Sequence, residues 1–373
     1  MKSNHGGCQI GGGALALLAL WKDPGVDTPR VEKLMEESKK AIIKQFSEGF
    51  GDGGMFWEGK GAGGIVTDTA LIPAIQAWRV AGGQDFVSPR PNIPAVTMLK
   101  VHELMTIGGQ AWYLIDKPNS YGTGYFGKSM PGQQRDRDGL SRSAQFAQGF
   151  GAVPEKLKPA ALWSYNHIVE PDPASRTFDT VSIYPHRPVL ALINWPIGVK
   201  EQNPAELLPK VHWDTVHQLY SFRNQWTGTE DDCVATLIFG SRDPQPVMVW
   251  GKGQKINFGT CPRGKTTHFR PADDGSGTLT VGGMAVGVDY SKASGADALV
   301  VVTGKVAPFK SDRVKRVDAA GHTFYVVLLG KAPDPTVDGE TITVGGQTIR
   351  FDGEQVVFGK MAPPPALPRM GMR

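Results

Sequence analysis

The sequence predicts an α+β protein of two domains, a helical part followed by an antiparallel β-sandwich. Over roughly the first 170 residues, apolar positions recur with the period of 3.6 that is typical of amphipathic helices. From about His212 onward they recur with the period of two that is typical of strands. Between the two patterns, prolines that break helices crowd about forty residues. They are Pro171, Pro173, Pro185, Pro188, Pro196, Pro204 and Pro209.

This change of pattern sets the expected boundaries: a helical domain over 1–170, a crossover over 171–210, a sandwich over 211–362 and a proline-rich tail over 363–373. The 373 residues are enough for two domains, each with its own core. The formal net charge is only +4, so the charge of the whole chain indicates no nucleic-acid partner. Any polyanion would have to bind a local basic cluster.

Local signals place the helices of the first part. Asp27 is expected to cap one helix, and two more are expected over 65–80 and 93–105. Each of these two is followed by a glycine pair, Gly82-Gly83 and Gly108-Gly109, which permits the left-handed residue that stops a helix. A long loop should then cover 113–134, and a helical pattern resumes from Leu140 to about Ile168.

The apolar run Ile10–Leu20 resembles the core of a secretory signal in length but is too short to span a bilayer. Trp21-Lys22-Asp23 follows directly, where a signal peptide would have small residues at a cleavage site. We therefore expect a buried helix here and no membrane span.

The second part contains short strand-like runs separated by turns rich in Gly and Asp, as in a sandwich. Val344-Gly345-Gly346-Gln347 is expected to form a two-residue hairpin turn. The expected strands are 218–222, 234–239, 246–250, 278–281, 298–302, 324–329, 341–344 and 347–351.

The three cysteines, Cys8, Cys233 and Cys261, are too few for a disulfide framework or a four-cysteine zinc site. Cys233 and Cys261 could pair on neighbouring strands, but buried free thiols are the favoured interpretation. The chain has no H-E-x-x-H zinc pair and no phosphate-loop motif. We expect no metal and no cofactor.

The stretch GFGDGGMFWEGKGAGG, from Gly49 to Gly64, has eight glycines in sixteen residues and begins with the letters G-x-G-x-x-G. A dinucleotide loop needs a strand before it and a helix after it that receives the pyrophosphate. Here a helix precedes the loop and the aromatic and acidic segment MFWEG follows it. The context argues against nucleotide binding.

Three segments together resemble the heparinase II/III-like polysaccharide lyases, relatives of the alginate and chondroitin lyases. They are Asn4-His5 before a helix, the loop Asp52–Gly59 (DGGMFWEG), and the strand entry Phe222–Trp226 (FRNQW) followed by Asp231-Asp232. The resemblance implies an incomplete α/α toroid packed on an antiparallel sandwich, which cleaves or binds a uronate-containing polysaccharide. Because Asn4 lies just after Met1, we also expect an N-terminally shortened member.

By this resemblance, Asn4 would neutralise the uronate carboxylate and His5 would assist proton transfer. Glu58 has three possible roles: a helix-start acid, an organiser of the glycine loop, or a catalytic carboxylate. His186 would face a cleft at the domain junction, with Arg187 beside it to bind substrate. The related lyases place a tyrosine shortly after the E-G of the loop, where this chain has Lys60 to Gly63, so Tyr125 of a later loop is the candidate replacement.

Substrate binding is expected from Trp57, by stacking on a sugar, and from a basic cluster over 252–270 without acidic residues. The cluster residues chosen are Lys252, Lys255, Arg263 and Lys265, which would hold sulfates or carboxylates. A solvated strand face would explain the same charges. Relatives carry histidines in this region that can bind zinc, whereas Val249–Lys255 contains none.

The resulting expectation is a lyase acting by β-elimination on an acidic polysaccharide, or a catalytically inactive module that binds one. Asp52 and Glu58 leave a glycoside hydrolase as a further alternative, since two carboxylates can hydrolyse a glycosidic bond. The resemblance implies a periplasmic or extracellular location. The polysaccharide and the oligomeric state are not specified by these signals.

Overall fold

The computed structural model describes residues 3–113, 125–126, 146–171, 186–242, 245–306 and 313–365. The chain divides into two compact units that are discontinuous in sequence. The first comprises Met1–Val101, Ile115–Pro204 and Asp214–His217. The second comprises His102–Leu114, Ala205–Trp213 and Gln218–Arg373. A short hairpin from within the predicted helical part therefore belongs to the second unit.

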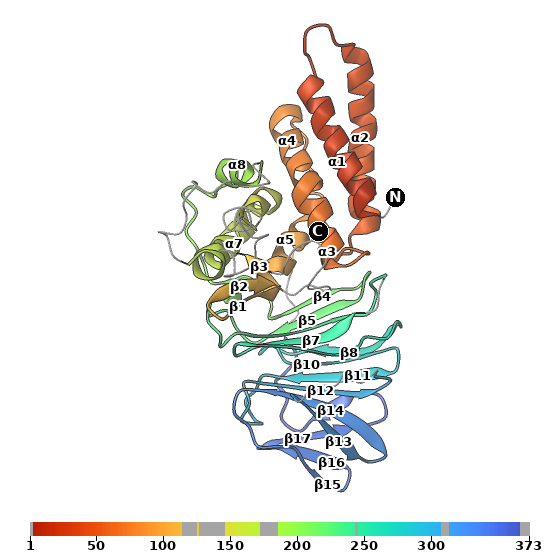
Figure 1. Cartoon of the computed structure of the whole chain (residues 1–373), viewed down its shortest axis with the longest axis vertical. Helices are drawn as coiled ribbons and strands as arrows, with labels where there is room; N and C mark the ends of the chain where they lie inside the picture. Colours follow the sequence, from red (N-terminus) through yellow and green to blue (C-terminus); the bar gives the residue numbers. More distant parts are fainter. Residues whose placement is uncertain are drawn as a thin grey trace, which may run out of the picture. The chain divides into compact units, whose positions relative to one another are not determined.

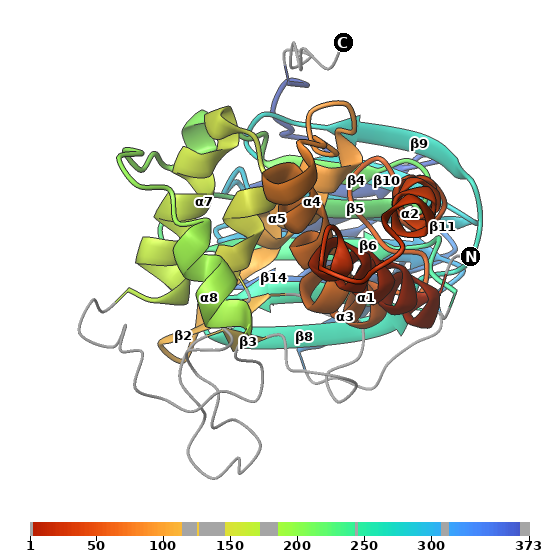
Figure 2. The same cartoon turned by 90° about the horizontal axis from the view of Figure 1, so that it is seen from above.

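The first unit is helical, and α1, α2 and α4 lie side by side in it (Figures 1 and 2). Its core contains Ile42, Phe46, Leu71 and Trp78. The helices are α1 (Asn4–Leu20), α2 (Thr28–Gly49), α3 (Lys60–Val66), α4 (Ile72–Gly82), α5 (Asn92–Glu103), α7 (Lys158–Ser164) and α8 (His186–Ile193), with π-helical turns at Thr67–Leu71 and Tyr165–Val169 and 3-10 turns at Gln148–Ala152 and Glu155–Leu157.

The predictions for α2 and α4 are confirmed. Asp27 caps α2 by accepting a hydrogen bond from the Arg30 N–H at 3.2 Å. The helix predicted over 65–80 is built from α3, the π-helical turn and α4, and it ends at Gly83 with a φ of 65°. The left-handed residue satisfies a carbonyl of the last turn, since its N–H bonds to the Trp78 carbonyl.

The predicted end of α5 is wrong. This helix ends at Glu103, and Leu104–Ile107 form strand β1, which pairs with β2 (Gln110–Tyr113). Gly108 and Gly109 have φ angles of 59° and 70° and form the two-residue turn between these strands. The glycine pair therefore closes a hairpin, where positive φ at both central residues matches the strand twist.

The N-terminal run is helical as predicted, but α1 begins earlier, so Asn4 and His5 lie in its first turn and not before it. The small residues Gly7, Gly11 and Ala14 form its buried face. Among the described helices, none has the length and apolar character needed to cross a bilayer.

Two further helical predictions need correction. The described part of the helix expected up to Ile168 is a series of short pieces, two 3-10 turns, α7 and a π-helical turn. The proline-rich crossover contains a helix, α8. Pro188 is tolerated there because it lies in the first turn, where the N–H that proline lacks would have no partner within the helix. The loop expected over 113–134 lies almost entirely outside the described residues.

The second unit consists of antiparallel sheets (Figure 1). A five-stranded sheet has the order β4-β5-β6-β7-β8, a six-stranded sheet β13-β14-β12-β11-β10-β9, and a four-stranded sheet β15-β16-β17-β18. Their strands are β4 (Val211–Asp214), β5 (Leu219–Arg223), β6 (Cys233–Ile238), β7 (Pro246–Gly251), β8 (Gln254–Thr260), β9 (Thr266–Pro271), β10 (Gly277–Val281), β11 (Met284–Asp289), β12 (Ala298–Gly304), β13 (Val314–Ala319), β14 (His322–Leu329), β15 (Thr336–Asp338), β16 (Thr341–Val344), β17 (Gln347–Phe351) and β18 (Val356–Phe358). The two-residue strand β3 (Tyr125–Phe126) lies in the first unit's sequence.

Two apolar layers hold these sheets together. Phe222, Val249 and Phe258 of the five-stranded sheet share a buried cluster with Leu279 and Val300 of the six-stranded sheet. The opposite face of the six-stranded sheet packs on the four-stranded sheet through a second cluster that includes Phe324, Ile342 and Ile349. Strands β5, β6, β10 and β11 are accordingly buried at every position, whereas β17 alternates between buried and exposed positions.

All eight predicted strands are present, and Val344 pairs with Gln347 across the predicted hairpin turn. Cys233 and Cys261 are buried free thiols, as favoured, and burial raises the pKa of each to about 12. Helices together with antiparallel sheets agree with the predicted α+β class. The toroid remains a prediction.

Candidate functional site

The glycine-rich loop runs from the end of α2 at Gly49 to the start of α3 at Lys60. It folds back on itself through a Gly51 N–H to Met55 carbonyl bond of 2.9 Å and a Trp57 N–H to Gly49 carbonyl bond of 2.9 Å. Phe50 and Phe56 form a bridge within it, and their ring centroids are 4.8 Å apart. The loop is therefore a defined turn and not an open strand-to-helix connection.

An internal carboxylate occupies this loop. Oδ2 of Asp214 accepts hydrogen bonds from the Gly53 and Met55 N–H groups, at 3.0 Å each. Oδ1 accepts from the N–H groups of Val216 at 3.1 Å and His217 at 2.7 Å. The loop binds an anion, as glycine-rich turns often do, but the anion is a side chain of the same chain.

The three glycines of the G-x-G-x-x-G pattern follow from this packing. A Cβ at Gly51 would lie 2.0 Å from Asp214 Oδ1, and Gly54 combines a φ of 82° with backbone atoms of Ala95 only 2.5 Å from a Cβ. At Gly49 a Cβ would meet the Phe56 ring at 2.9 Å. With its N–H groups used internally and helices on both sides, the loop has no place for a pyrophosphate.

Asp52 lies beside Asp214 and binds the next residue. Its carboxylate accepts from the Thr215 N–H at 2.7 Å and from the Thr215 hydroxyl at 2.6 Å. Burial opposes ionisation of Asp52, but the bonds from Thr215 outweigh it and hold its pKa below the usual range. Burial raises the pKa of Asp214 to about 6, and the nearby negative charge of Asp52 raises it further. Hydrogen bonds from the N–H groups of His217, Met55 and Gly53 lower it, but by less. The two carboxyls thus ionise at different pH, and Asp214 keeps its proton longer.

Asn4, His5 and Glu58 come together at the start of α1. The Asn4 N–H donates to Glu58 Oε2 at 2.7 Å, although the residues are 54 positions apart. Glu58 therefore caps α1 and not α3, the helix that follows it in sequence. Its carboxylate lies at the positive end of the α1 dipole.

The other donors of this first turn also have partners. The His5 N–H bonds to Asn4 Oδ1 at 2.8 Å, and the Gly6 N–H bonds to Ser3 Oγ at 3.1 Å. With the backbone donors used, the groups that could meet a ligand are side chains: the amide Nδ2 of half-buried Asn4 and the exposed ring of His5. Trp57, next to Glu58, is half-buried.

The other predicted residues of the first unit are not brought to this cluster by any described contact. His186 and Arg187 begin α8, and Tyr125 begins β3, but their side chains lie outside the described part of the chain. Asp52 and Glu58, the carboxylates of the hydrolase alternative, bind different segments, Thr215 and Asn4. Each already has a structural role.

The residues of the basic cluster in the second unit have different partners. Lys252 forms ion pairs with Asp231 at 2.5 Å and Asp297 at 3.4 Å, so its charge is paired within the second unit. Arg263 donates to the Arg242 carbonyl, and Lys265 is exposed. Lys255 alone contacts aromatic rings, those of Trp112 and Trp250. The sequence reasoning missed Trp112 and Asp214, because their partners lie far away in the chain.

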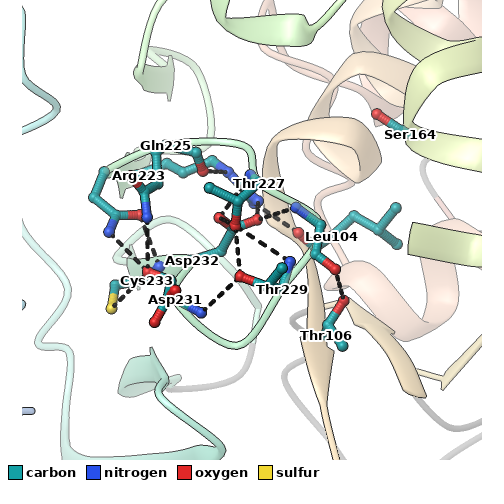
Figure 3. Close-up of polar contacts among 12 residues, drawn as sticks. Leu104, Thr106, Ser164, Arg223, Gln225, Thr227, Thr229, Asp231, Asp232 and Cys233 are labelled. Carbon is teal, nitrogen blue, oxygen red and sulfur yellow. Dashed lines mark hydrogen bonds and ion pairs between the residues drawn. The ribbon is translucent and has the colours of Figure 1, made fainter. Parts of the chain in front are cut away.

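Arg223 and Asp232 of the resembling strand entry form a buried ion pair of 2.6 Å (Figure 3). Arg223 also donates to the carbonyls of His102 at 2.9 Å and Leu104 at 2.6 Å. The segment that resembles the lyases is thus structural here, because it joins the start of β1 to the five-stranded sheet.

Within the residues that the structure describes, no group of three or more His, Cys, Asp or Glu side chains is placed to hold a metal ion. No protein-family model matches the sequence, and no curated protein matches it.

Proposed function

We propose that this protein is a polysaccharide lyase-like protein that acts by β-elimination on an acidic, uronate-containing polysaccharide. One observation carries the proposal: the 2.7 Å hydrogen bond from Asn4 to Glu58. Asn4-His5 and the glycine loop are the two segments that resemble the catalytic motifs of the heparinase II/III-like lyases, and this bond makes them neighbours. The proposed fold is correspondingly an incomplete α/α toroid followed by a sandwich.

The proposed chemistry assigns each group one task. A base takes the proton from C5 of the uronate, the C5–H electrons form the C4=C5 double bond, and the C4–O glycosidic bond breaks. Negative charge grows on the uronate carboxylate as the C5 proton leaves and before the C4–O bond breaks, and Asn4 Nδ2 stabilises it by donating a hydrogen bond. His5 is exposed and would assist the transfer of this proton. The leaving oxygen needs an acid, for which a tyrosine of another loop, Tyr125, is the candidate.

Glu58 is a positioning residue in this proposal. Its carboxylate holds the Asn4 N–H, and Asn4 Oδ1 in turn holds the His5 N–H. The three residues are therefore aligned by one chain of hydrogen bonds. Trp57, beside Glu58, would stack on a neighbouring sugar of the substrate.

A binding module without turnover is the second candidate. Ala62 lies within helix α3 and packs against the apolar core, at the place where related lyases carry the catalytic tyrosine. A protein that kept the scaffold and lost this group would bind its polysaccharide without cleaving it. By the same resemblance, the proposed location is periplasmic or extracellular.

An absorbance assay tests the proposal. The protein is incubated with alginate, heparin, chondroitin and pectate, and a lyase should produce the absorbance of an unsaturated uronate with at least one of them. His5→Ala should abolish this signal, whereas His322→Ala, an exposed histidine of β14 in the second unit, should not change it. New reducing ends without the absorbance would indicate hydrolysis, and binding without cleavage would indicate the module.

A further inference from the structure

Lys255 and Trp112 form an exposed pair on the second unit. Lys255 lies on β8, the edge strand of the five-stranded sheet, and Trp112 lies on β2 of the hairpin. The Lys255 ammonium lies 3.0 Å from the centroid of the Trp112 ring and 5.6 Å from that of Trp250. Lys255 is exposed and Trp112 is half-buried, so a molecule in solution can reach both.

The hairpin that carries Trp112 is held firmly in this unit. The Thr106 hydroxyl donates to the Gly228 carbonyl at 2.9 Å, and the Gly108 N–H donates to Glu230 Oε1 at 2.7 Å (Figure 3 shows the Thr106 end). Arg223 holds the start of β1 through the Leu104 carbonyl. Because β1 is fixed at these points and Met105 of β1 pairs with Trp112 of β2, the backbone that carries Trp112 is held in place.

The charge of Lys255 has no acidic partner among the residues that the structure describes, in contrast to Lys252, which is three positions earlier and has two. The ammonium end lies against the rings although the residue as a whole is exposed. Partial burial lowers the pKa of Lys255 to about 8. A partly desolvated, unpaired cation interacts strongly with an incoming anion, because little water must be removed.

We propose that Lys255 and Trp112 form a binding subsite for a carboxylate-bearing pyranose. The ammonium would pair with the carboxylate, and the indole would pack against the apolar C–H groups of the sugar beside it. The sugar class rests on the proposed function, whereas the pairing of the ammonium with an anion does not.

The test is a titration with tetragalacturonate, followed by NMR of the Trp112 indole N–H, which Trp112→Phe assigns. Lys255→Met keeps the chain length and removes the charge, Lys255→Arg keeps the charge, and Lys252→Met is the matched control. The fully methyl-esterified tetrasaccharide provides the same sugar without its charge, and sodium sulfate provides an anion without a sugar. Thermal melting of each variant verifies folding.

We expect Lys255→Met to weaken binding by about tenfold or more, the loss of one charge-assisted hydrogen bond. Lys255→Arg and Lys252→Met should bind as the wild type. The methyl ester should leave the Trp112 signal unchanged, and sulfate, which can pair with the ammonium but has no sugar for the indole, should bind more weakly than tetragalacturonate. Wild-type binding by Lys255→Met, or an equal response to the ester or to sulfate, would overturn the subsite. If binding depends on Lys255 but no lyase absorbance appears, only the proposed lyase activity is contradicted. If the lyase absorbance appears but binding does not depend on Lys255, only the subsite is contradicted.

Discussion

The backbone N–H of Gly53 donates to Oδ2 of Asp214, a residue 161 positions later, at 3.0 Å. This bond explains the feature of the sequence that most resembles a nucleotide site. The glycine loop needs small residues and free N–H groups because a carboxylate of the same chain packs into it. The loop in turn carries Trp57 and Glu58, so Asp214 supports the proposed site without touching it.

Stability should fall as pH rises because of Asp214. Its folded pKa is about 6, above the usual 3.8, so its contribution is complete below pH 3.8 and is lost as pH rises through 6. Relative to Asp214→Asn, the wild type should lose about 2 kcal/mol of unfolding free energy between pH 4 and pH 7. Urea unfolding at several pH values measures this difference.

Asp85→Asn is the matched control for that experiment. The pKa of Asp85 is lowered, chiefly by hydrogen bonds from Ser88, so its contribution should be lost as pH falls and not as it rises. If the unfolding free energy of both variants depended on pH with the same slope, the loss of stability between pH 4 and pH 7 could not be assigned to Asp214.

Glu58 should behave as a positioning residue. Glu58→Gln keeps an oxygen that can accept the Asn4 N–H, so uronate unsaturation should stay within about threefold of the wild type, whereas Glu58→Ala should lower it by about tenfold or more. The rate of absorbance change on the substrate found active measures both. If Glu58→Gln were as inactive as Glu58→Ala, the carboxylate itself would take part in proton transfer.

Two adjacent glycines of α1 should respond oppositely to alanine. A Cβ at Gly11 would lie 2.6 Å from the Ala70 backbone, whereas a Cβ at Gly12 would meet nothing within 4 Å. Gly11→Ala should destabilise the protein by roughly 1–3 kcal/mol through overpacking. Gly12→Ala should stabilise it by roughly 0.5–1 kcal/mol, since alanine favours the helix. Equal effects in urea unfolding would show that α1 does not pack closely on residue 70.

The Arg223–Asp232 pair should matter far more than a surface pair. Both side chains are fully buried, so Arg223→Met leaves an unpaired carboxylate and should cost roughly 3–5 kcal/mol of unfolding free energy. Arg316→Ala breaks an exposed pair with Asp318 and should change stability by less than about 1 kcal/mol. Chemical denaturation compares the two, and a small effect of Arg223→Met would mean that water reaches Asp232.

Much of the fold was predictable because its signals are local. Asp27 caps α2 within three residues, and the strands are short apolar runs, of which some, such as β17, alternate buried and exposed positions. The end of α5 was not predictable in this way. A glycine pair permits either a helix stop or a hairpin turn, and the partner strand of Gln110–Tyr113 made the choice.

For the candidate site, the residue types could be read from the chain, but their roles could not. The pattern DGGMFWEG identified a special loop and Asn4-His5 a special helix start, because those signals are short and contiguous. Only the tertiary structure decided that Glu58 caps Asn4, that Asp214 fills the glycine loop, and that Lys252 is neutralised while Lys255 faces Trp112. Charge and hydrogen-bond pairing depend on distance in space, and residues more than fifty positions apart are brought within 3 Å only by the packing of the whole unit.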